Sequence, residues 1–197
     1  LPDSFITNTL KTNNIHPRWI NAQHALLFPT GRMVLHLNDD SPLAPSLAQL
    51  LNQIAPTPQS LTLTSEQTTT FYEWTDGQTA VDQYLTTNPL TPADNTLNQP
   101  STCTPETPLS HPKLGNTATF LGWQSLTPLT AGQPYQGLSV WRIEQPLDTP
   151  LSIFVHLLAA DGTIIAQSDR FDVTHDYLQA GDTLIQQLTM ICKWSKQ

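Results

Sequence analysis

Exposed aromatic side chains are the groups in this sequence best suited to hold a ligand. A sugar ring presents a flat array of C–H bonds that packs on an indole, and tryptophan combines a broad apolar face with an N–H donor. Trp123 and Trp141 lie in predicted strands, where indoles fill the interior of a β-sandwich. The carbohydrate-stacking candidates are therefore Trp19, Trp74 and Trp194, with burial in the core as the alternative for each.

Acidic residues near the end of the chain could instead gather oxygen atoms around a cation. Calcium takes six to eight oxygen ligands, and the candidate metal ligands are Asp169, Asp172 and Asp176, in a segment that also holds His175 and Asp182. Their spacing matches no EF-hand loop, and loops between strands are ordinarily polar. Bound calcium (Ca2+) is thus one interpretation and ordinary loop polarity is the other, and no further cofactor is expected.

No set of residues with the pattern of a catalytic site occurs in the sequence. It contains no P-loop, no dinucleotide fingerprint and no HExxH, GxSxG or CxxC motif. Asp39 and Asp40 precede Ser41 and Pro42 and are better explained as turn and helix-cap residues than as an acid–base pair. His156, among apolar neighbours, is expected to be a hydrogen-bonded structural histidine. We therefore predict no catalytic residue and no enzymatic activity for this fragment.

Composition favours a mainly β protein that does not bind nucleic acid. Only 38% of the residues are apolar and 12% are charged, and the uncharged polar remainder is rich in Thr and Pro, which suits strands and irregular connections. The net charge of −8 and the eight Lys and Arg residues disfavour both nucleic acid and anionic membrane surfaces. No apolar run of about 18 residues occurs, so no bilayer-spanning helix is predicted. The chain starts at Leu1 without Met, and is expected to be a piece of a longer protein.

The two cysteines, Cys103 and Cys192, lie far apart in the sequence. A disulfide between them would close a loop of about 90 residues and stabilise the fold by ~4–5 kcal/mol in the chain-entropy model. Both a bridge and two unpaired thiols agree with the sequence.

A proline-rich passage divides the chain into three parts. Prolines at this density fit neither a helix nor a central strand, so the passage is predicted to be an extended linker. The predicted parts are a small α+β unit at residues 1–88, the Pro/Thr-rich linker at 89–112 and a β-sandwich module at 113–197.

Within the first part, apolar periodicity predicts both strands and helices. Residues 24–28 and 32–37 flank Pro29-Thr30-Gly31 and predict a hairpin. Residues 46–55 carry leucines at helical spacing, with Asp40 or Ser41 as the expected cap and Pro56 as the stop. Further strands are expected at 61–63 and 70–74, and a short helix at 79–87.

After the linker the pattern predicts strands alone, joined by turns. The expected strands are 117–125, 135–145, 151–158, 163–168 and 183–191. Asp161-Gly162 supplies the turn of a hairpin from Ser152 to Asp169, and a shift of apolar parity between Val140 and Trp141 predicts a bulge. This spacing favours an antiparallel β-sandwich, immunoglobulin-like or jelly-roll-like. Five strands are few for a sandwich, so we expect an open sheet edge that forms a homodimer or is covered by the N-terminal unit.

Several stretches of the second half together resemble a known module. It is the β-sandwich in the extracytoplasmic C-terminal region of bacterial integral-membrane glycosyltransferase-like proteins, which are similar to lipid-linked-sugar-dependent mannosyltransferases. The likeness covers about 80 residues and is carried by Leu114 to Trp123, Leu138 to Arg142, Phe154 to Leu157, Asp161-Gly162, Ala166 to Asp169 and Gly181-Asp182. More loosely, Arg18-Trp-Ile20 and His24 to Pro29 resemble the small unit that follows the last membrane helix in these proteins. The family's proline-rich loop and final strand pair are absent, and Arg170-Phe171 stands where small and proline residues are usual.

The resemblance implies a non-catalytic, extracytoplasmic accessory domain, at the cell surface or in the periplasm, tethered by a membrane-embedded part of the parent protein. Its implied role is to position glycan or acceptor, and its implied partners are a glycan or a cell-envelope protein. The acidic residues that carry out transfer in that family lie between membrane helices, and nothing here matches them. The alternatives are a free-standing carbohydrate-binding module and a structural or adhesive domain that pairs through an open strand edge.

Overall fold

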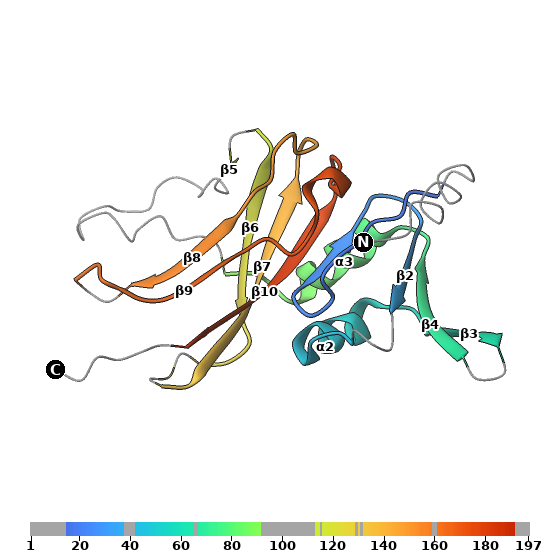
Figure 1. The fold of residues 1–197 in the computed structure, drawn as a ribbon, viewed down its shortest axis with the longest axis horizontal. Helices are drawn as coiled ribbons and strands as arrows, with labels where there is room; N and C mark the ends of the chain where they lie inside the picture. The colour runs from blue at the N-terminus through green and yellow to red at the C-terminus, as the bar shows by residue number, and fades with distance from the viewer. Residues whose placement is uncertain are drawn as a thin grey trace.

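A five-stranded antiparallel sheet forms the centre of the molecule (Figure 1). The computed structural model describes residues 15–37, 42–64, 67–91, 113–114, 116–128, 130, 132–158 and 161–191. In spatial order the strands are β1 (Ala25–Phe28), β10 (Thr183–Ile191), β7 (Pro134–Ile143), β6 (Ala118–Ser125) and β5 (Lys113–Leu114). The first strand that the structure describes therefore pairs with the last one, over Ala25↔Gln186 to Phe28↔Thr183.

The hairpin predicted at residues 24–37 is wrong. Its two halves form β1 and β2 (Met33–Leu37), which belong to different sheets. The reason lies in their patterns, because all four residues of β1 are buried whereas β2 alternates between half-buried and exposed positions. A strand whose side chains are buried on both faces needs a sheet that is covered on both faces, as the five-stranded sheet is at β1, while an alternating strand suits a sheet with one solvated face.

The second sheet has the order β2-β4-β3, with β3 (Gln59–Thr64) and β4 (Gln67–Trp74), and two helices lie next to it (Figure 1). Helix α2 (Pro45–Ile54) begins at the N-cap Ala44, which makes no side-chain cap bond, and not at the predicted cap Asp40 or Ser41. Proline at the first helical position lacks the N–H that would have needed a cap and has a suitable φ. The predicted stop before Pro56 is confirmed.

Helix α3 (Gly77–Thr87) is capped by Asp76, whose carboxylate accepts hydrogen bonds from the Gln78 amide (3.1 Å), the Thr79 hydroxyl (2.9 Å) and the Gly31 amide (3.1 Å). The Thr79 hydrogen bond, with those from the amides, lowers the pKa of Asp76 below its usual 3.8, although partial desolvation opposes this. One side chain thus both starts the helix and holds the loop before β2.

The two helices cover one face of the five-stranded sheet, and their side chains share a core with it. Leu26 and Phe28 of β1, Leu47 and Leu51 of α2, and Val140 of β7 belong to this cluster. Ala25 and Leu27 of β1 point to the opposite face and join a second cluster. Residues before and after the predicted linker therefore contribute to one core. The division into 1–88, 89–112 and 113–197 stays a prediction, since residues 92–112 lie outside the described part.

A two-stranded hairpin, β8 (Ile153–Leu158) with β9 (Ile164–Arg170), lies over the other face of the sheet (Figure 1). At its base, Ile153 and the adjacent Phe171 face Ile143 of β7 and Leu184 of β10 across a small apolar gap. The predicted strand alternates between its two faces, since Ile153 is buried and Val155 and Leu157 are half-buried, whereas Phe154 and Leu158 are exposed. This hairpin and the sheet make the β-sandwich-like half of the fold.

The predicted bulge occurs at the expected level of the sheet but on the neighbouring strand. The register runs from Phe120↔Trp141 to Gly122↔Val140, so Leu121 of β6 is the extra residue. Gly122 has φ +140, and a Cβ there would lie 2.7 Å from the carbonyl oxygen of Thr91, which bridges to Trp123. The parity shift in β7 thus reports a bulge in its partner.

The predicted fold class, mainly β with a small α+β unit and an antiparallel β-sandwich, is confirmed. The strands predicted at 117–125, 135–145, 151–158, 163–168 and 183–191 all form, within a few residues. The open sheet edge was expected either to form a homodimer or to be covered by the N-terminal part. The second alternative applies to β10, because β1 pairs with it. Among the described residues, no helix is long and apolar enough to cross a bilayer.

Candidate ligand-binding groove

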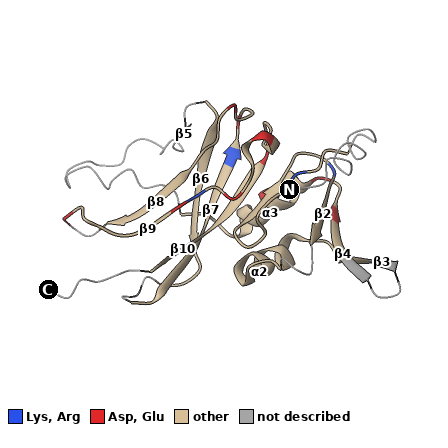
Figure 2. Cartoon of the chain, in the orientation of Figure 1, with Lys and Arg blue, Asp and Glu red and all other residues tan. Residues whose placement is uncertain are grey.

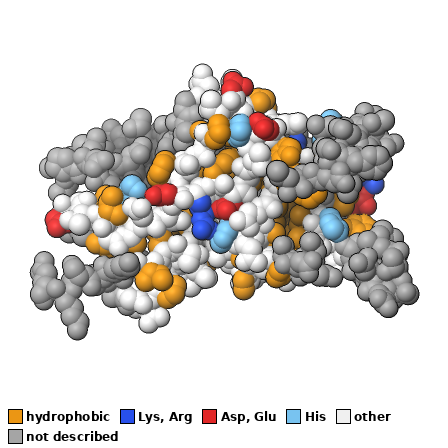
Figure 3. All heavy atoms as spheres, viewed as in Figure 1, with side chains coloured by type: hydrophobic (Ala, Val, Ile, Leu, Met, Phe, Trp, Pro, Cys, Tyr) orange, Lys and Arg blue, Asp and Glu red, His pale blue; other side chains and the backbone are white. Residues whose placement is uncertain are grey.

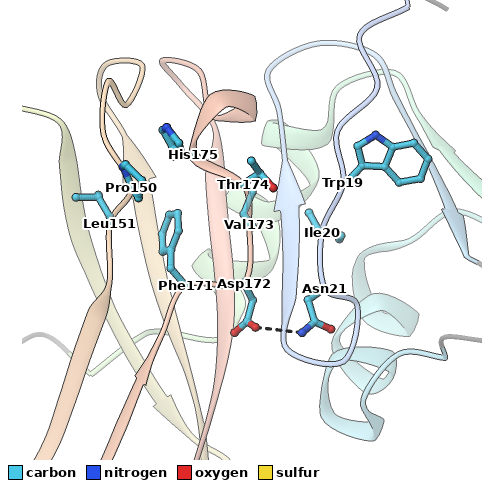
Figure 4. A pocket seen from close by; sticks show the side chains of 10 residues that line it. All are labelled: Trp19, Ile20, Asn21, Pro150, Leu151, Phe171, Asp172, Val173, Thr174 and His175. Atoms are coloured by element: carbon cyan, nitrogen blue, oxygen red, sulfur yellow. Dashed lines mark hydrogen bonds between the residues drawn. The ribbon is translucent and has the colours of Figure 1, made fainter. Parts of the chain in front are cut away.

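An open groove of about 510 Å³ lies where the N-terminal segment meets the loop after β9 (Figure 4). Its apolar lining comes from Ile20, Pro150, Leu151, Phe171 and Val173. Its remaining lining residues are Trp19, Asn21, Asp172, Thr174 and His175. Three separate stretches of the chain build it, so no local motif in the sequence marks it.

Backbone pairing holds the two walls of the groove together. Ile20 forms an isolated antiparallel bridge with Val173, and the amide of Asn21 donates to the carbonyl of Asp172 (3.0 Å). The side chains repeat this contact, since Asn21 Nδ2 donates to Asp172 Oδ1 over 3.1 Å (Figure 4). Backbone hydrogen bonds therefore fix the relative positions of the two stretches that line the groove.

A buried ion pair fixes the same segment two residues before Ile20. Arg18 Nη1 donates to Asp182 Oδ2, and Arg18 Nη2 donates to Gln179 Oε1 over 2.9 Å. The Asp182 side chain is only 1% exposed and also accepts from the Gln179 amide at 2.7 Å. Arg18 thus ties the N-terminal wall to the turn that enters β10, and Gly181 with φ +88 allows that tight turn.

The groove combines an aromatic ring with several hydrogen-bonding groups. Figure 4 shows Phe171 close to Pro150 and below His175, with the Asn21–Asp172 pair beneath them. Within the described residues, Asp172 Oδ2 is buried without a hydrogen-bond partner, and Arg170 Nε lies 3.8 Å from it. A flat apolar surface beside amide, carboxylate and imidazole groups can hold a ligand that has both C–H faces and hydroxyls.

The three carbohydrate-stacking candidates differ in their location and exposure. Trp19 lines the groove and is 45% exposed, but its indole points away from Phe171, beyond Ile20 (Figure 4). Trp74 is 5% exposed, packs edge-on against Phe28 at 6.0 Å and donates its Nε1–H to the Ile54 carbonyl, so its prediction as a sugar platform is wrong. Trp194 lies outside the described residues, as do Cys103 and Cys192.

The three candidate metal ligands each have a separate neighbour. Asp169 lies 3.8 Å from His156 on the hairpin, Asp172 binds Asn21, and Asp176 pairs with His175 at 2.9 Å. The structure brings no three His, Cys, Asp or Glu side chains together as a metal site in the part of the chain that it describes. Calcium binding stays a prediction without a shared set of ligands.

His156 is not a core residue. Its side chain is 38% exposed on the outer face of β8, next to Asp169 at a distance too long for a hydrogen bond. The expectation of a hydrogen-bonded structural histidine came from its apolar neighbours, but those neighbours alternate with it across the strand.

Sequence reasoning identified Asp172 and Trp19 separately and missed that they border one groove. It did not select Phe171, Pro150 or Asn21. No local pattern singles out these three residues, because the stretches that hold them lie far apart in the sequence. Comparisons with protein-family models, curated proteins and solved structures found no match.

Figure 2 shows acidic residues on several turns and on the short helix η2 (His175–Tyr177), with few basic residues. Arg142 is paired with Asp82 at 2.8 Å, Arg32 with Glu73, and Arg18 with Asp182. Because carboxylates already neutralise these arginines in the described part of the chain, little positive charge is left to bind an anionic ligand. This favours an uncharged ligand.

Proposed function

We propose that this chain is a non-catalytic accessory domain that binds a glycan in the groove lined by residues 19–21, 150–151 and 171–175. The observation that carries the proposal is the placing of Phe171 beside the polar pair of Asn21 and Asp172. Sugar recognition requires a flat apolar surface for the ring face and planar hydrogen-bonding groups for neighbouring hydroxyls. An amide group can donate to and accept from such hydroxyls, and a carboxylate can accept from them.

An open groove suits an extended chain of sugars better than a small buried metabolite, because the chain can enter and leave along the surface. The lining contains an exposed Thr174 and the half-buried His175, both able to contact further hydroxyls. The acidic character of the whole chain also disfavours phosphorylated or sulfated ligands.

The resemblance described above supplies the biological setting of the proposal. In that setting the domain is extracytoplasmic, belongs to a membrane-embedded glycosyltransferase-like protein and helps to position glycan or acceptor. The gene that encodes the chain is then expected to encode several apolar spans before Leu1. Coding sequence without such spans would remove this setting but leave glycan binding to be tested by itself.

Binding is tested first on an array of bacterial and fungal polysaccharides, mannan included, and then by titration calorimetry with the best oligosaccharide. Phe171→Leu keeps an apolar side chain against the core but removes the flat ring, and Thr174→Trp adds bulk at an exposed position in the groove. The matched control is Phe154→Ala, which removes an aromatic ring that is 65% exposed on the hairpin.

We expect Phe171→Leu to weaken binding by about fivefold or more, since a lost ring contact removes ~1 kcal/mol or more. Thr174→Trp should also weaken binding, because the added indole occupies space in the groove. Phe154→Ala should bind like the wild type, and circular dichroism should show all three variants folded. A folded wild-type protein that gives no response on the array, or equal binding by all variants, would contradict the proposed function.

A further inference from the structure

The outer long edge of strand β8 is unprotected within the described part of the chain. β8 pairs with β9 from Ile153↔Arg170 to Leu158↔Ile164, and within the described part of the chain no second strand pairs with it. Natural proteins usually protect such an edge with charged residues, proline or a bulge that twists it away. Residues 151–160 contain no Asp, Glu, Lys, Arg or Pro.

Apolar side chains accompany this edge on the outer face of the hairpin. Phe154 is 65% exposed, Leu158 46% and Ile164, which faces Leu158 from β9, 48%. Figure 3 shows apolar side chains reaching the surface over this part of the molecule. Contiguous exposed apolar groups next to a free strand edge are the features of a surface that adds a strand.

We propose that β8 pairs antiparallel with β8 of a second copy of this chain, around a two-fold axis at His156. In this register Phe154 lies opposite the partner's Leu158, and Val155 lies opposite the partner's Leu157. The same contacts repeat on the other side of the axis, because a two-fold interface uses one patch twice. Two hairpins then form one four-stranded sheet with apolar pairs across the seam on both faces.

The absence of charge along this edge allows a second copy as the occupant, and the self-complementary sequence favours it. The chain carries a net charge of −8, so two copies repel each other over most of their surfaces, and the uncharged stretch 151–160 is where they can meet with little repulsion. The apolar residues at positions 154 and 158 lie at equal distances from His156, so the strand is complementary to itself. A six-residue seam is smaller than a standard interface, so we expect a dissociation constant in the micromolar range or weaker.

Substitutions at His156 test the seam directly, because the two copies of this residue would lie about 5 Å apart. His156→Glu or His156→Lys places like charges opposite each other, whereas a mixture of the two variants places opposite charges there. The matched control is Gln167→Glu, which adds the same charge on the same exposed face but on β9, away from the seam. All proteins are the full chain, studied by sedimentation velocity over a range of concentrations.

For the wild type and Gln167→Glu, the mean mass should rise from 21.8 kDa toward twice that value as concentration increases. Each His156 variant alone should dimerise about tenfold more weakly or not at all, and the mixture should regain the dimer. A wild type that stays at 21.8 kDa throughout, as it would if another part of the chain covered β8, overturns the proposal. So does a wild-type dimer that neither His156 variant weakens, since the copies would then meet elsewhere.

Discussion

Arg18 and Asp182 form the ion pair that joins the N-terminal wall of the groove to the rest of the fold, with side-chain exposures of 16% and 1%. Arg18→Met leaves the carboxylate of Asp182 buried without its counter-charge, which costs about 3 kcal/mol or more. We expect the free energy of unfolding, measured with urea, to fall by that amount. Adding Asp182→Asn to Arg18→Met should restore part of the loss, because the asparagine removes the unpaired charge and can still accept from the Gln179 amide.

The matched control for this pair is Arg32→Met. Arg32 pairs with Glu73 but its side chain is 75% exposed, so its loss should cost less than about 1 kcal/mol. Equal effects of Arg18→Met and Arg32→Met would show that the buried pair does not hold the N-terminal segment. Glycan binding should fall with Arg18→Met even where the protein is still folded, because residues 19–21 would lose their anchor.

Asp76 predicts a specific dependence of stability on pH. The Thr79 hydroxyl first, with the amides of Gly31 and Gln78, lowers the pKa of Asp76 in the folded chain. The stabilisation is therefore present above the unfolded value of 3.8 and is lost as pH falls through the lower folded value. Asp76→Asn keeps a good N-cap but has no charge, so its urea midpoint should lie below that of the wild type near neutral pH. The two midpoints should converge in acid.

Thr79→Val provides the control for this titration, since it removes the largest contribution to the lowered pKa and leaves the carboxylate in place. Near neutral pH, Asp76→Asn should lower the urea midpoint of the Thr79→Val variant by less than it lowers the urea midpoint of the wild type. Parallel curves for wild type and Asp76→Asn at all pH values would contradict the assignment of the cap to the charged carboxylate.

The bulge in β6 is the element whose geometry is most dependent on one residue. Gly122 has φ +140, and a Cβ would meet the Thr91 carbonyl oxygen at 2.7 Å and Leu90 Cβ at 2.8 Å. Gly122→Ala should therefore cost about 3 kcal/mol, from backbone strain together with a clash that neither neighbour can easily relieve. Gly162→Ala is the control, because Gly162 has φ +85 but nothing within 4 Å, and should cost only about 1 kcal/mol. Thermal unfolding of both variants gives the comparison, and equal losses would mean that the contact with Thr91 is unimportant.

Elements with a local signature could be predicted from the sequence, and their partners could not. The leucines of α2 at helical spacing and the uninterrupted β pattern of residues 183–191 identified both elements within a residue or two. The pairing of β1 was predicted wrongly, because its partner strand, β10, lies at the other end of the chain, whereas Pro29-Thr30-Gly31 suggested pairing with the next strand in the sequence. The same limit explains the groove, whose walls come from residues 19–21, 150–151 and 171–175. Local pattern placed Asp172 and Trp19, but only long-range pairing made them neighbours.

At the scale of the whole molecule, α2, α3 and β1 share one core with β7 and β10, although the proline-rich passage separates them in sequence. The chain should therefore unfold as one cooperative unit, and a substitution that destabilises a helix should also destabilise the distant sheet.

Leu47 of α2 is 0% exposed, so Leu47→Ala should destabilise the protein by about 3 kcal/mol. Hydrogen exchange should then show the amides of β10 losing protection by roughly 100-fold, as much as those of α2, since both exchange through global unfolding. Val34→Ala, at a position that is 56% exposed on β2, should leave the stability and the amide protection of β10 and α2 unchanged. If Leu47→Ala exposed α2 but left β10 protected, the helices and the sheet would be separate folding units, and the N-terminal wall of the groove could detach without unfolding the β-sandwich.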